Sequence, residues 1–132
     1  MEKTFVMIKP DGVAKNIIGN VISRFEAAGL VIKNLKMLEM TRDQARELYS
    51  VHSDKPFYDS LVSFILSGPV VVMVLEGEDA VVTVRGLMGA TNPKEAAPGT
   101  IRADFAEEIE KNIVHGSDSQ ESYQRESIIF FS

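Results

Sequence analysis

Segments with the apolar pattern of strands alternate along the chain with segments that have the periodicity of helices. Residues 3–9 form a short run rich in β-branched and aromatic side chains, which favours a strand, and the Pro-Asp-Gly sequence at 10–12 favours a turn. Over residues 16–28 apolar side chains recur at helical spacing, and Gly29 follows where a left-handed helix cap belongs. This part of the sequence predicts a strand, a turn and a helix.

The next segments predict a bulged strand followed by two helices. Residues 30–39 keep an imperfect period-2 alternation whose apolar face shifts partway, as a β-bulge would make it. Thr41 and Gln44 have the spacing of a capping box, in which the hydroxyl and the amide side chain each bind a free backbone N–H. This helix should run through Tyr49, and a second should begin at Pro56, because proline suits the first helical turn.

The second half of the chain predicts a buried strand, a long loop and further helices. Residues 70–75 are all apolar, which in so short a run is typical of a strand buried on both faces. Asp79 can cap a helix after this strand, and residues 89–103 carry glycine and proline with scarcely any periodicity, so we expect an extended loop. A short helix near 104–111 and a last helix opened by a capping box at 118–121 complete the chain.

Strands thus alternate with helices throughout, and this alternation on its own favours an α/β fold with a doubly wound sheet. No internal repeat, low-complexity tract or linker interrupts the pattern. A chain of 132 residues, 45% hydrophobic and 25% charged, suits one core. We therefore expect residues 1–132 to form a single domain.

Composition removes several classes of function. The net charge of -5 disfavours a general nucleic-acid binder, although a local cationic pocket can still hold a phosphorylated small molecule. The sequence has no cysteine, which excludes disulfides and thiolate chemistry and fits a reducing compartment. No secretory signal is evident, and the longest apolar run is far short of the roughly 18 residues that suggest a membrane span. We expect a cytoplasmic protein with no membrane partner.

One histidine stands in a setting that suits nucleophilic chemistry. His115 follows two apolar residues that would anchor its backbone and precedes Gly116, so the sequence presents an imidazole at the end of a strand. A neutral imidazole has one nitrogen free to attack, and Glu126 lies further on as a carboxylate that would orient the ring. A surface or capping histidine is the alternative interpretation.

Phosphoryl transfer to such a nucleophile needs cationic and hydrogen-bonding groups around the phosphate. Arg85, Thr91 and Arg102 flank the long loop and can supply them, and Lys9 ends the first predicted strand. Taken alone, Arg85, Thr91 and Arg102 are better explained as solvated surface or turn residues, and Lys9 is otherwise a surface lysine. The sequence contains no P-loop and no dinucleotide-binding glycine motif, so a nucleotide would be bound in another way.

Four ordered motifs make the chain resemble the nucleoside diphosphate kinases. They are IKPDG at 8–12, TNP at 91–93, PGTIR at 98–102 and NIVHGSD at 112–118, and the resemblance extends from residue 3 to residue 131. It implies a ferredoxin-like α/β sandwich, an α+β arrangement in which helices cover a four-stranded antiparallel sheet. The strands would lie near residues 3–9, 31–39, 70–76 and 112–117.

The resemblance also implies an enzyme. His115 would take the γ-phosphoryl group of a nucleoside triphosphate and pass it to a nucleoside diphosphate, in a ping-pong reaction through phosphohistidine. Glu126 would orient the imidazole, Ser117 would hydrogen-bond that carboxylate, and Tyr49 would lie beside the ring. Mg²⁺ is expected to arrive on the nucleotide phosphates, with no side-chain metal ligands.

The same resemblance assigns a nucleotide site. The matching phosphate and ribose ligands are Lys9, His52, Arg85, Thr91, Arg102 and Asn112, of which Lys9 and Asn112 also belong to the catalytic group. Phe57 would stack on the base, with Leu61 near it and Ile109 on its other face, and such contacts scarcely distinguish one base from another. From helical spacing alone, Phe57 and Leu61 are better explained as core residues.

The implied partners are nucleoside triphosphates and diphosphates, such as ATP and GDP, and further copies of the chain. Family members form dimers that combine into tetramers or hexamers, and one sequence does not choose between them. Two alternatives remain, a non-enzymatic nucleotide-binding or regulatory module on the same fold and a phosphohistidine relay protein. The presence of His115 and Glu126 argues against the first, and the presence of Phe57 argues against the second.

Overall fold

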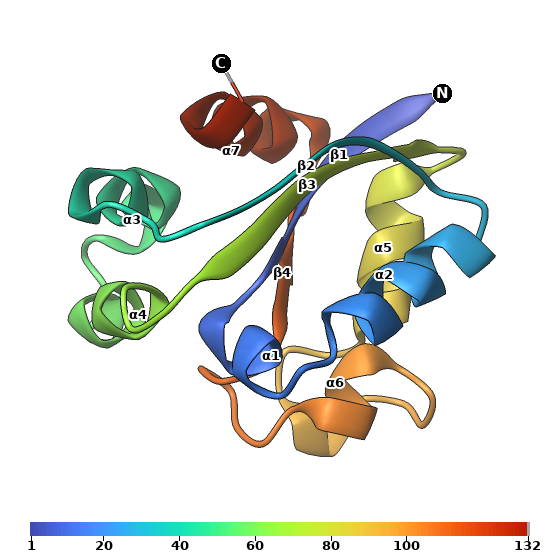
Figure 1. Ribbon diagram of the computed structural model, residues 1–132. Coiled ribbons are helices and arrows are strands. Elements are labelled where there is room, and N and C mark those ends of the chain that lie inside the picture. Colours follow the sequence, from blue (N-terminus) through green and yellow to red (C-terminus); the bar gives the residue numbers. More distant parts are fainter. Residues whose placement is uncertain (132) are drawn as a thin grey trace.

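Four strands pair into one antiparallel sheet in the computed structural model, which describes residues 1–131 (Figure 1). In space they follow the order β2-β3-β1-β4, which is the order of a ferredoxin-like sandwich. The expected fold class is therefore confirmed, and the doubly wound sheet that alternation alone favours is not formed. The strands are β1 (Glu2–Ile8), β2 (Val31–Leu38), β3 (Val70–Gly77) and β4 (Val114–Gly116).

Helices cover both faces of this sheet. One face packs against α2, α5 and α6, and the other packs against α3, α4 and α7 (Figure 1). No helix formed by residues 1–131 has the length and apolar character to cross a membrane. The helices are α1 (Pro10–Ala14), α2 (Ile18–Ala27), α3 (Arg42–Leu48), α4 (Tyr58–Ile65), α5 (Ala80–Met88), α6 (Ile101–Phe105) and α7 (Gln120–Phe131), with short 3-10 helices η1 (Ser50–His52) and η2 (Pro93–Glu95).

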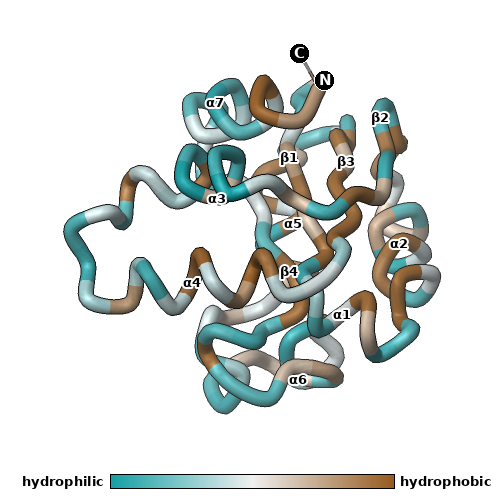
Figure 2. The backbone as a smooth tube through the Cα atoms, turned by 60° about the vertical axis from the view of Figure 1, so that its left-hand side comes forward, coloured by the Kyte–Doolittle hydropathy of each residue, from teal (hydrophilic) through white to brown (hydrophobic). Residues whose placement is uncertain are grey.

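The two central strands, β1 and β3, form the core because helices shield them on both sides. Successive side chains of a strand point to opposite faces, so Val6 and Ile8 pack under α2 and α5, whereas Phe5 and Met7 pack under α3, α4 and α7. Figure 2 shows the hydrophobic positions along these strands. The unbroken apolar run of β3 is thus explained by burial of both its faces, as the sequence predicts.

Several local expectations are confirmed in detail. Gly29 ends the segment after α2 with φ of 89°, in the left-handed region. The β2–β3 pairing shifts register between Ile32 and Asn34, where a bulge is expected. Thr41 and Gln44 make both bonds of the capping box at the start of α3. These features depend on residues close together in sequence, and the pattern alone therefore predicts them.

Other expectations are wrong where helix starts are concerned. Residues 10–14 form a short helix and no simple turn, because Pro10 takes the first helical position after an extended Lys9. Asp79 precedes α5 in a left-handed conformation with no side-chain cap bond, and the amide of Val81 donates instead to Oε1 of Glu2 at 2.8 Å. The cap comes from another part of the chain, which sequence spacing does not show.

The expected long loop is partly helical. Oγ1 of Thr100 accepts from the amide of Ala103 at 3.2 Å, so a helix begins at Ile101 and the helix expected near 104–111 lies earlier, at 101–105. The helix expected to begin at Pro56 begins instead at Tyr58. The last helix is capped by Ser119, whose hydroxyl accepts from the amide of residue 122 at 3.1 Å, one position later than the expected capping box at 118–121.

The capping box of α3 gives a first testable prediction. In Thr41→Ala the amide of Gln44 loses its acceptor, so the free energy of unfolding should fall by about 1 kcal/mol. Urea denaturation followed by circular dichroism measures this difference. Thr41→Ser keeps the oxygen and should stay close to the parent. An equal loss in both variants would show that the methyl group and not the cap is responsible.

Candidate active site

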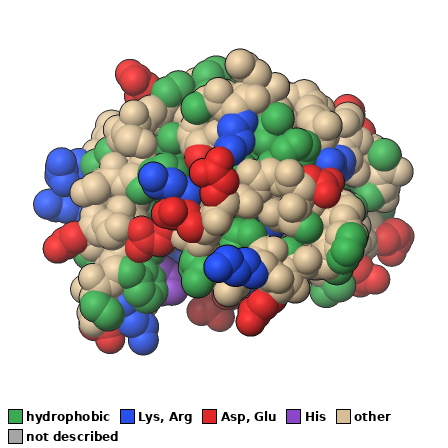
Figure 3. Space-filling view, turned by 90° about the horizontal axis from the view of Figure 1, so that it is seen from below, with side chains coloured by type: hydrophobic (Ala, Val, Ile, Leu, Met, Phe, Trp, Pro, Cys, Tyr) green, Lys and Arg blue, Asp and Glu red, His purple; other side chains and the backbone are tan. Residues whose placement is uncertain are grey.

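A cavity of about 730 Å³ gathers residues from distant parts of the chain. It extends from the end of β1 to α7, and it takes one wall from α3, η1 and α4 and another from the segment before β4. Figure 3 views the molecule from the α6 end and shows a histidine between hydrophobic and basic side chains. Every site residue expected from the sequence except Ser117 lines this cavity, namely Lys9, Tyr49, His52, Phe57, Leu61, Arg85, Thr91, Arg102, Ile109, Asn112, His115 and Glu126.

His115 is fixed by a carboxylate on one side of its ring. The residue lies on β4 opposite Met7 of β1, and its Nε2 is 2.9 Å from Oε1 of Glu126 in α7. A carboxylate only accepts hydrogen bonds, so Nε2 is the donor, and in the neutral ring Nδ1 keeps its lone pair. The His115 side chain is 24% exposed, whereas that of Glu126 is 5% exposed. The ring can therefore meet a ligand, and the carboxylate acts only through the ring.

Glu126 is held in its ionised form by its neighbours. Ser117 donates its hydroxyl to Oε1 of Glu126 at 2.7 Å, and Nη2 of Arg125 lies 3.3 Å from Oε2. Burial alone would raise the pKa of Glu126, but the hydrogen bonds from His115 and Ser117 and the charge of Arg125 bring this pKa below its usual value. Ser117, which does not line the cavity, thus belongs to the site through Glu126.

Arg102 is a buried cation bonded to three backbone carbonyls, which belong to two segments of the chain. Its Nε, Nη1 and Nη2 donate to the carbonyls of Asn112 at 3.3 Å, Gly89 at 2.9 Å and Val114 at 2.8 Å. Burial and the charge of Arg85 lower the pKa of Arg102 to about 10, so the guanidinium stays charged at neutral pH. Arg85 in turn donates to the carbonyl of Gly116 at 3.0 Å. Both arginines are therefore fixed to the strand that carries His115.

Lys9 is a third cation at the same cavity. Its Nζ donates to Oδ1 of Asn112 at 2.9 Å, and Nδ2 of Asn112 donates to the carbonyl of Thr91 at 3.2 Å. Burial, followed by the charge of Arg102, lowers the pKa of Lys9 to about 8. Among the described residues, none of Lys9, Arg85 and Arg102 forms a salt bridge with a carboxylate. Their positive charge is available to an anionic ligand.

The other end of the cavity is apolar and open. Phe57 is 40% exposed and Ile109 is 55% exposed, so the interpretation of Phe57 as a core residue is wrong. Leu61 is half-buried and packs against the core beneath α4. The His52 ring lies 5.6 Å from the Phe57 ring, centroid to centroid. Exposed aromatic and aliphatic side chains at one cavity suit a flat heteroaromatic ring.

The structure adds residues that sequence motifs do not single out. Arg125 bonds Glu126 and also donates to the carbonyl of Glu47 at 3.0 Å, which links α7 to the end of α3. In the sequence, only the position of Arg125 next to Glu126 could have indicated that it belongs to the site. Within residues 1–131, no group of three or more His, Asp or Glu side chains is placed to hold a metal ion. The further lining residues are Leu48, Val51, Glu110, Gly116, Asp118, Ser122 and Arg125.

Comparison with known proteins identifies relatives over the whole chain. The sequence profile described as nucleoside diphosphate kinase matches residues 2–132. A nucleoside diphosphate kinase of Picrophilus torridus is 58% identical over 132 residues, which is 100% of this chain and 96% of that protein. A nucleoside diphosphate kinase of a Nitratiruptor species has the same identity and the same coverage.

Solved structures agree with the sequence comparison. The Aquifex aeolicus nucleoside diphosphate kinase superposes with a TM-score of 0.97 at 46% identity, over 99% of this chain and 95% of that chain. A halophilic nucleoside diphosphate kinase from Halobacterium salinarum, solved in complex with CDP, gives a TM-score of 0.96 at 49% identity, over 99% of this chain and 88% of that chain. The fold, the site and these relatives define a nucleotide-binding phosphotransferase. More particularly, the chain belongs to the nucleoside diphosphate kinase family.

The buried charge of Lys9 gives a second testable prediction. Its pKa is about 8 in the folded protein and 10.5 ordinarily, so between these pH values the unfolded chain binds more protons and stability rises with pH. At pH 7 the charged form lowers stability by about 3 kcal/mol. Without ligand, Lys9→Met should therefore be more stable than the parent at pH 7, by a margin that shrinks by about pH 9.5. Urea denaturation at both pH values measures this margin.

The exposed Lys3, on the strand β1 that precedes Lys9, provides the control for this prediction. Lys3→Met should show a small margin that hardly changes over the same pH interval. If the margin of Lys9→Met stayed constant or grew with pH, the charge of Lys9 would not be the source of the instability.

Proposed function

We propose that His115 is the nucleophile of a ping-pong phosphoryl transfer between nucleotides. The lone pair on Nδ1 attacks the γ-phosphorus of a nucleoside triphosphate, the bond from phosphorus to the β–γ bridging oxygen breaks, and a nucleoside diphosphate leaves. A terminal oxygen of the next diphosphate then attacks the phosphohistidine and restores the ring. The observation that carries the proposal is the Nε2–Glu126 contact, which leaves Nδ1 free beside an unpaired cationic cluster.

Each neighbour of His115 has a role in this reaction. The ionised Glu126, kept in place by Ser117, stabilises the positive charge that the ring gains on phosphorylation. Arg85, Arg102 and Thr91 bind the phosphate oxygens and stabilise the charge of the transferred group. Their fixed geometry supports this assignment, because both guanidiniums are already bonded to the backbone around His115.

The remaining polar residues hold the sugar and the other phosphates. Lys9 and Asn112, already bonded to each other, bind the ribose hydroxyls and the phosphates, and His52 lies near the α-phosphate. Burial, together with the charge of Glu126, raises the pKa of Tyr49 above its usual range, so its hydroxyl stays protonated and donates near His115. The base lies between Phe57 and Ile109, with Leu61 beneath it, and the slot accepts all common bases.

Mg²⁺ fits this site as an ion that the phosphates carry. Lys9, Arg85 and Arg102 match phosphate oxygens, and hard divalent ions bound to nucleotides keep waters and phosphate ligands in place of a protein cage. The metal would neutralise charge on the β- and γ-phosphates, while the side chains named above orient the nucleotide.

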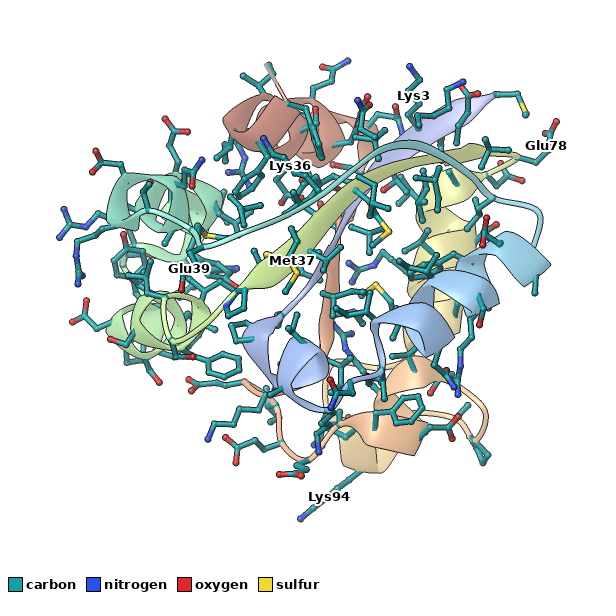
Figure 4. The ribbon with its side chains drawn as sticks, viewed as in Figure 1. Lys3, Lys36, Met37, Glu39, Glu78 and Lys94 are labelled. Carbon is teal, nitrogen blue, oxygen red and sulfur yellow. The ribbon has the colours of Figure 1, made fainter. Side chains whose placement is uncertain are left out.

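We further propose that the chain forms a single domain and that its copies assemble into dimers, which combine into a tetramer or hexamer. We place this assembly in the cytoplasm. The outer edge of β2 pairs with no strand in the described part of the chain, and Val31, Leu35 and Met37 on it are each about half exposed. Figure 4 labels Met37 on this strand. An apolar edge strand is a surface that proteins usually cover, and a second copy of the chain supplies the cover.

The test begins with labelling in the absence of an acceptor. The protein is incubated with Mg²⁺ and γ-labelled ATP and is then chased with unlabelled GDP. We expect a label on the protein that is acid-labile, base-stable and discharged by GDP. A folded protein that binds ATP without taking up label would contradict the proposed mechanism.

Replacement of the nucleophile gives a third testable prediction. His115→Ala should abolish labelling and transfer, whereas ATP affinity should remain, because Lys9 and both arginines still bind the phosphates. The chain has only two histidines, so His52→Ala is the matched control and should still take up label. Substantial transfer by His115→Ala would refute the assignment of the nucleophile.

The base slot gives a fourth testable prediction. Phe57→Ala removes the stacking face and should weaken the binding of all nucleotides by similar factors, equivalent to about 1–3 kcal/mol. Calorimetric titration with ADP, GDP, CDP and UDP measures the four affinities. Val51→Ala, another exposed apolar residue at the cavity, serves as the control. A loss confined to one base would show that the slot selects among bases.

A further inference from the structure

Two positions before His115 the backbone adopts a conformation that isoleucine rarely takes. Ile113 has φ of 75°, and the amide of Val114 donates to the carbonyl of Asn112 at 2.9 Å, so residues 112–114 form a γ-turn with positive φ. For a β-branched residue this region is a true outlier, and such residues persist only where their surroundings hold them.

Both backbone polar groups of Ile113 are bonded to the start of α1. Its amide donates to Oδ2 of Asp11 at 3.0 Å, and its carbonyl accepts from the amide of Lys9 at 2.7 Å. Its side chain is fully buried, and a Cβ added at Gly12 would lie 3.1 Å from its Cγ2. The turn is therefore held by hydrogen bonds on one side and by packing on the other.

Asp11 is in an unfavourable setting by the usual rules of burial. Its second oxygen, Oδ1, is buried and has no hydrogen-bond partner among the described residues. Buried polar atoms are normally paired, and an unpaired one in a native structure calls for an explanation. The charge of Asp11 also raises the pKa of Lys9. That electrostatic effect does not depend on the bond to Ile113, so it does not explain why the bond exists.

The turn that Asp11 binds connects two parts of the proposed active site. On one side of Ile113, the Asn112 side chain accepts from Nζ of Lys9. On the other side, Val114 leads to His115, which contacts Glu126. If Ile113 relaxed to a negative φ, the peptide planes on both sides would rotate, and Asn112 and His115 would lose their relative placement.

We propose that Asp11 is a positioning residue, which holds the γ-turn at Ile113 and thereby sets His115 and Asn112 at their working distances. It acts through the backbone of Ile113 and does not touch the nucleotide. The inference rests on the proposed role of His115.

The test compares kcat at saturating nucleotide in two variants of Asp11. Asp11→Ala removes the acceptor and should lower kcat between about 10- and 100-fold, the range expected when a reacting group is displaced by about an ångström. Asp11→Asn keeps an oxygen acceptor without the charge and should stay within about threefold of the parent. Equal losses in both variants would assign the effect to charge and overturn the proposal, as would a parent-like Asp11→Ala.

A destabilising substitution elsewhere in the core serves as the control for loss of stability. Ile65→Ala, at a fully buried position of α4 in the core on the other face of the sheet from Ile113, destabilises the fold and should keep the parent kcat. Labelling by γ-labelled ATP is measured for every variant. An unlabelled parent would refute the role of His115, whereas a labelled parent with a parent-like Asp11→Ala would refute the role of Asp11 alone.

Two further measurements test the turn itself. Glycine adopts positive φ freely, so Asp11→Ala should lower kcat much less in an Ile113→Gly background than in the parent. If Ile113→Gly does not fold, amide hydrogen exchange decides. The Ile113 amide should exchange at least about 100-fold faster in Asp11→Ala and at nearly the parent rate in Asp11→Asn, with Met73 of β3 as the reference amide. Unchanged exchange in Asp11→Ala would overturn the proposal.

Discussion

The geometry of the cavity depends on the burial of one charge, the guanidinium of Arg102. Its bonds to Gly89, Asn112 and Val114 join the end of α5 to the segment that leads into β4. The guanidinium gives each of these carbonyls a donor, and a buried acceptor left without a partner costs free energy. An arginine has five N–H donors, so some remain for a ligand after the backbone is satisfied. The same side chain therefore maintains the architecture and supplies charge to the site.

The sheet explains how residues more than a hundred positions apart come together. Because β1 pairs with β4, the end of β1 places Lys9 beside Asn112, which lies 103 residues further along the chain. Helices on both faces keep this pairing free of water. The preorganised cations have an energetic consequence, since like charges and a buried lysine oppose folding and are relieved by an anion. The apo protein is therefore less stable than its fold alone would allow.

The sequence predicts what depends on neighbouring residues, and tertiary contacts determine the rest. The run of β3, the bulge in β2 and the capping box of α3 follow from local pattern. The start of α5 does not, because Glu2, on the neighbouring strand β1 and 79 residues away in sequence, binds its free amide. Motifs identify the residue types of the site, but they do not show that Nε2 of His115 faces Glu126 or that Asp11 binds Ile113. The latter pair is 102 residues apart.

The exposure of Phe57 and Ile109 has a consequence for turnover. In a ping-pong cycle two nucleotides occupy the same slot in succession, and the first must depart before the second arrives. In the proposed binding mode, the exposed Phe57 and Ile109 would leave the base partly in water and hold it weakly, whereas the buried Lys9 and Arg102 would hold the phosphates. Such a division would let spent nucleotide exchange rapidly without loosening the groups that perform the chemistry. A fully enclosed base would bind more tightly and slow the enzyme at the step of release.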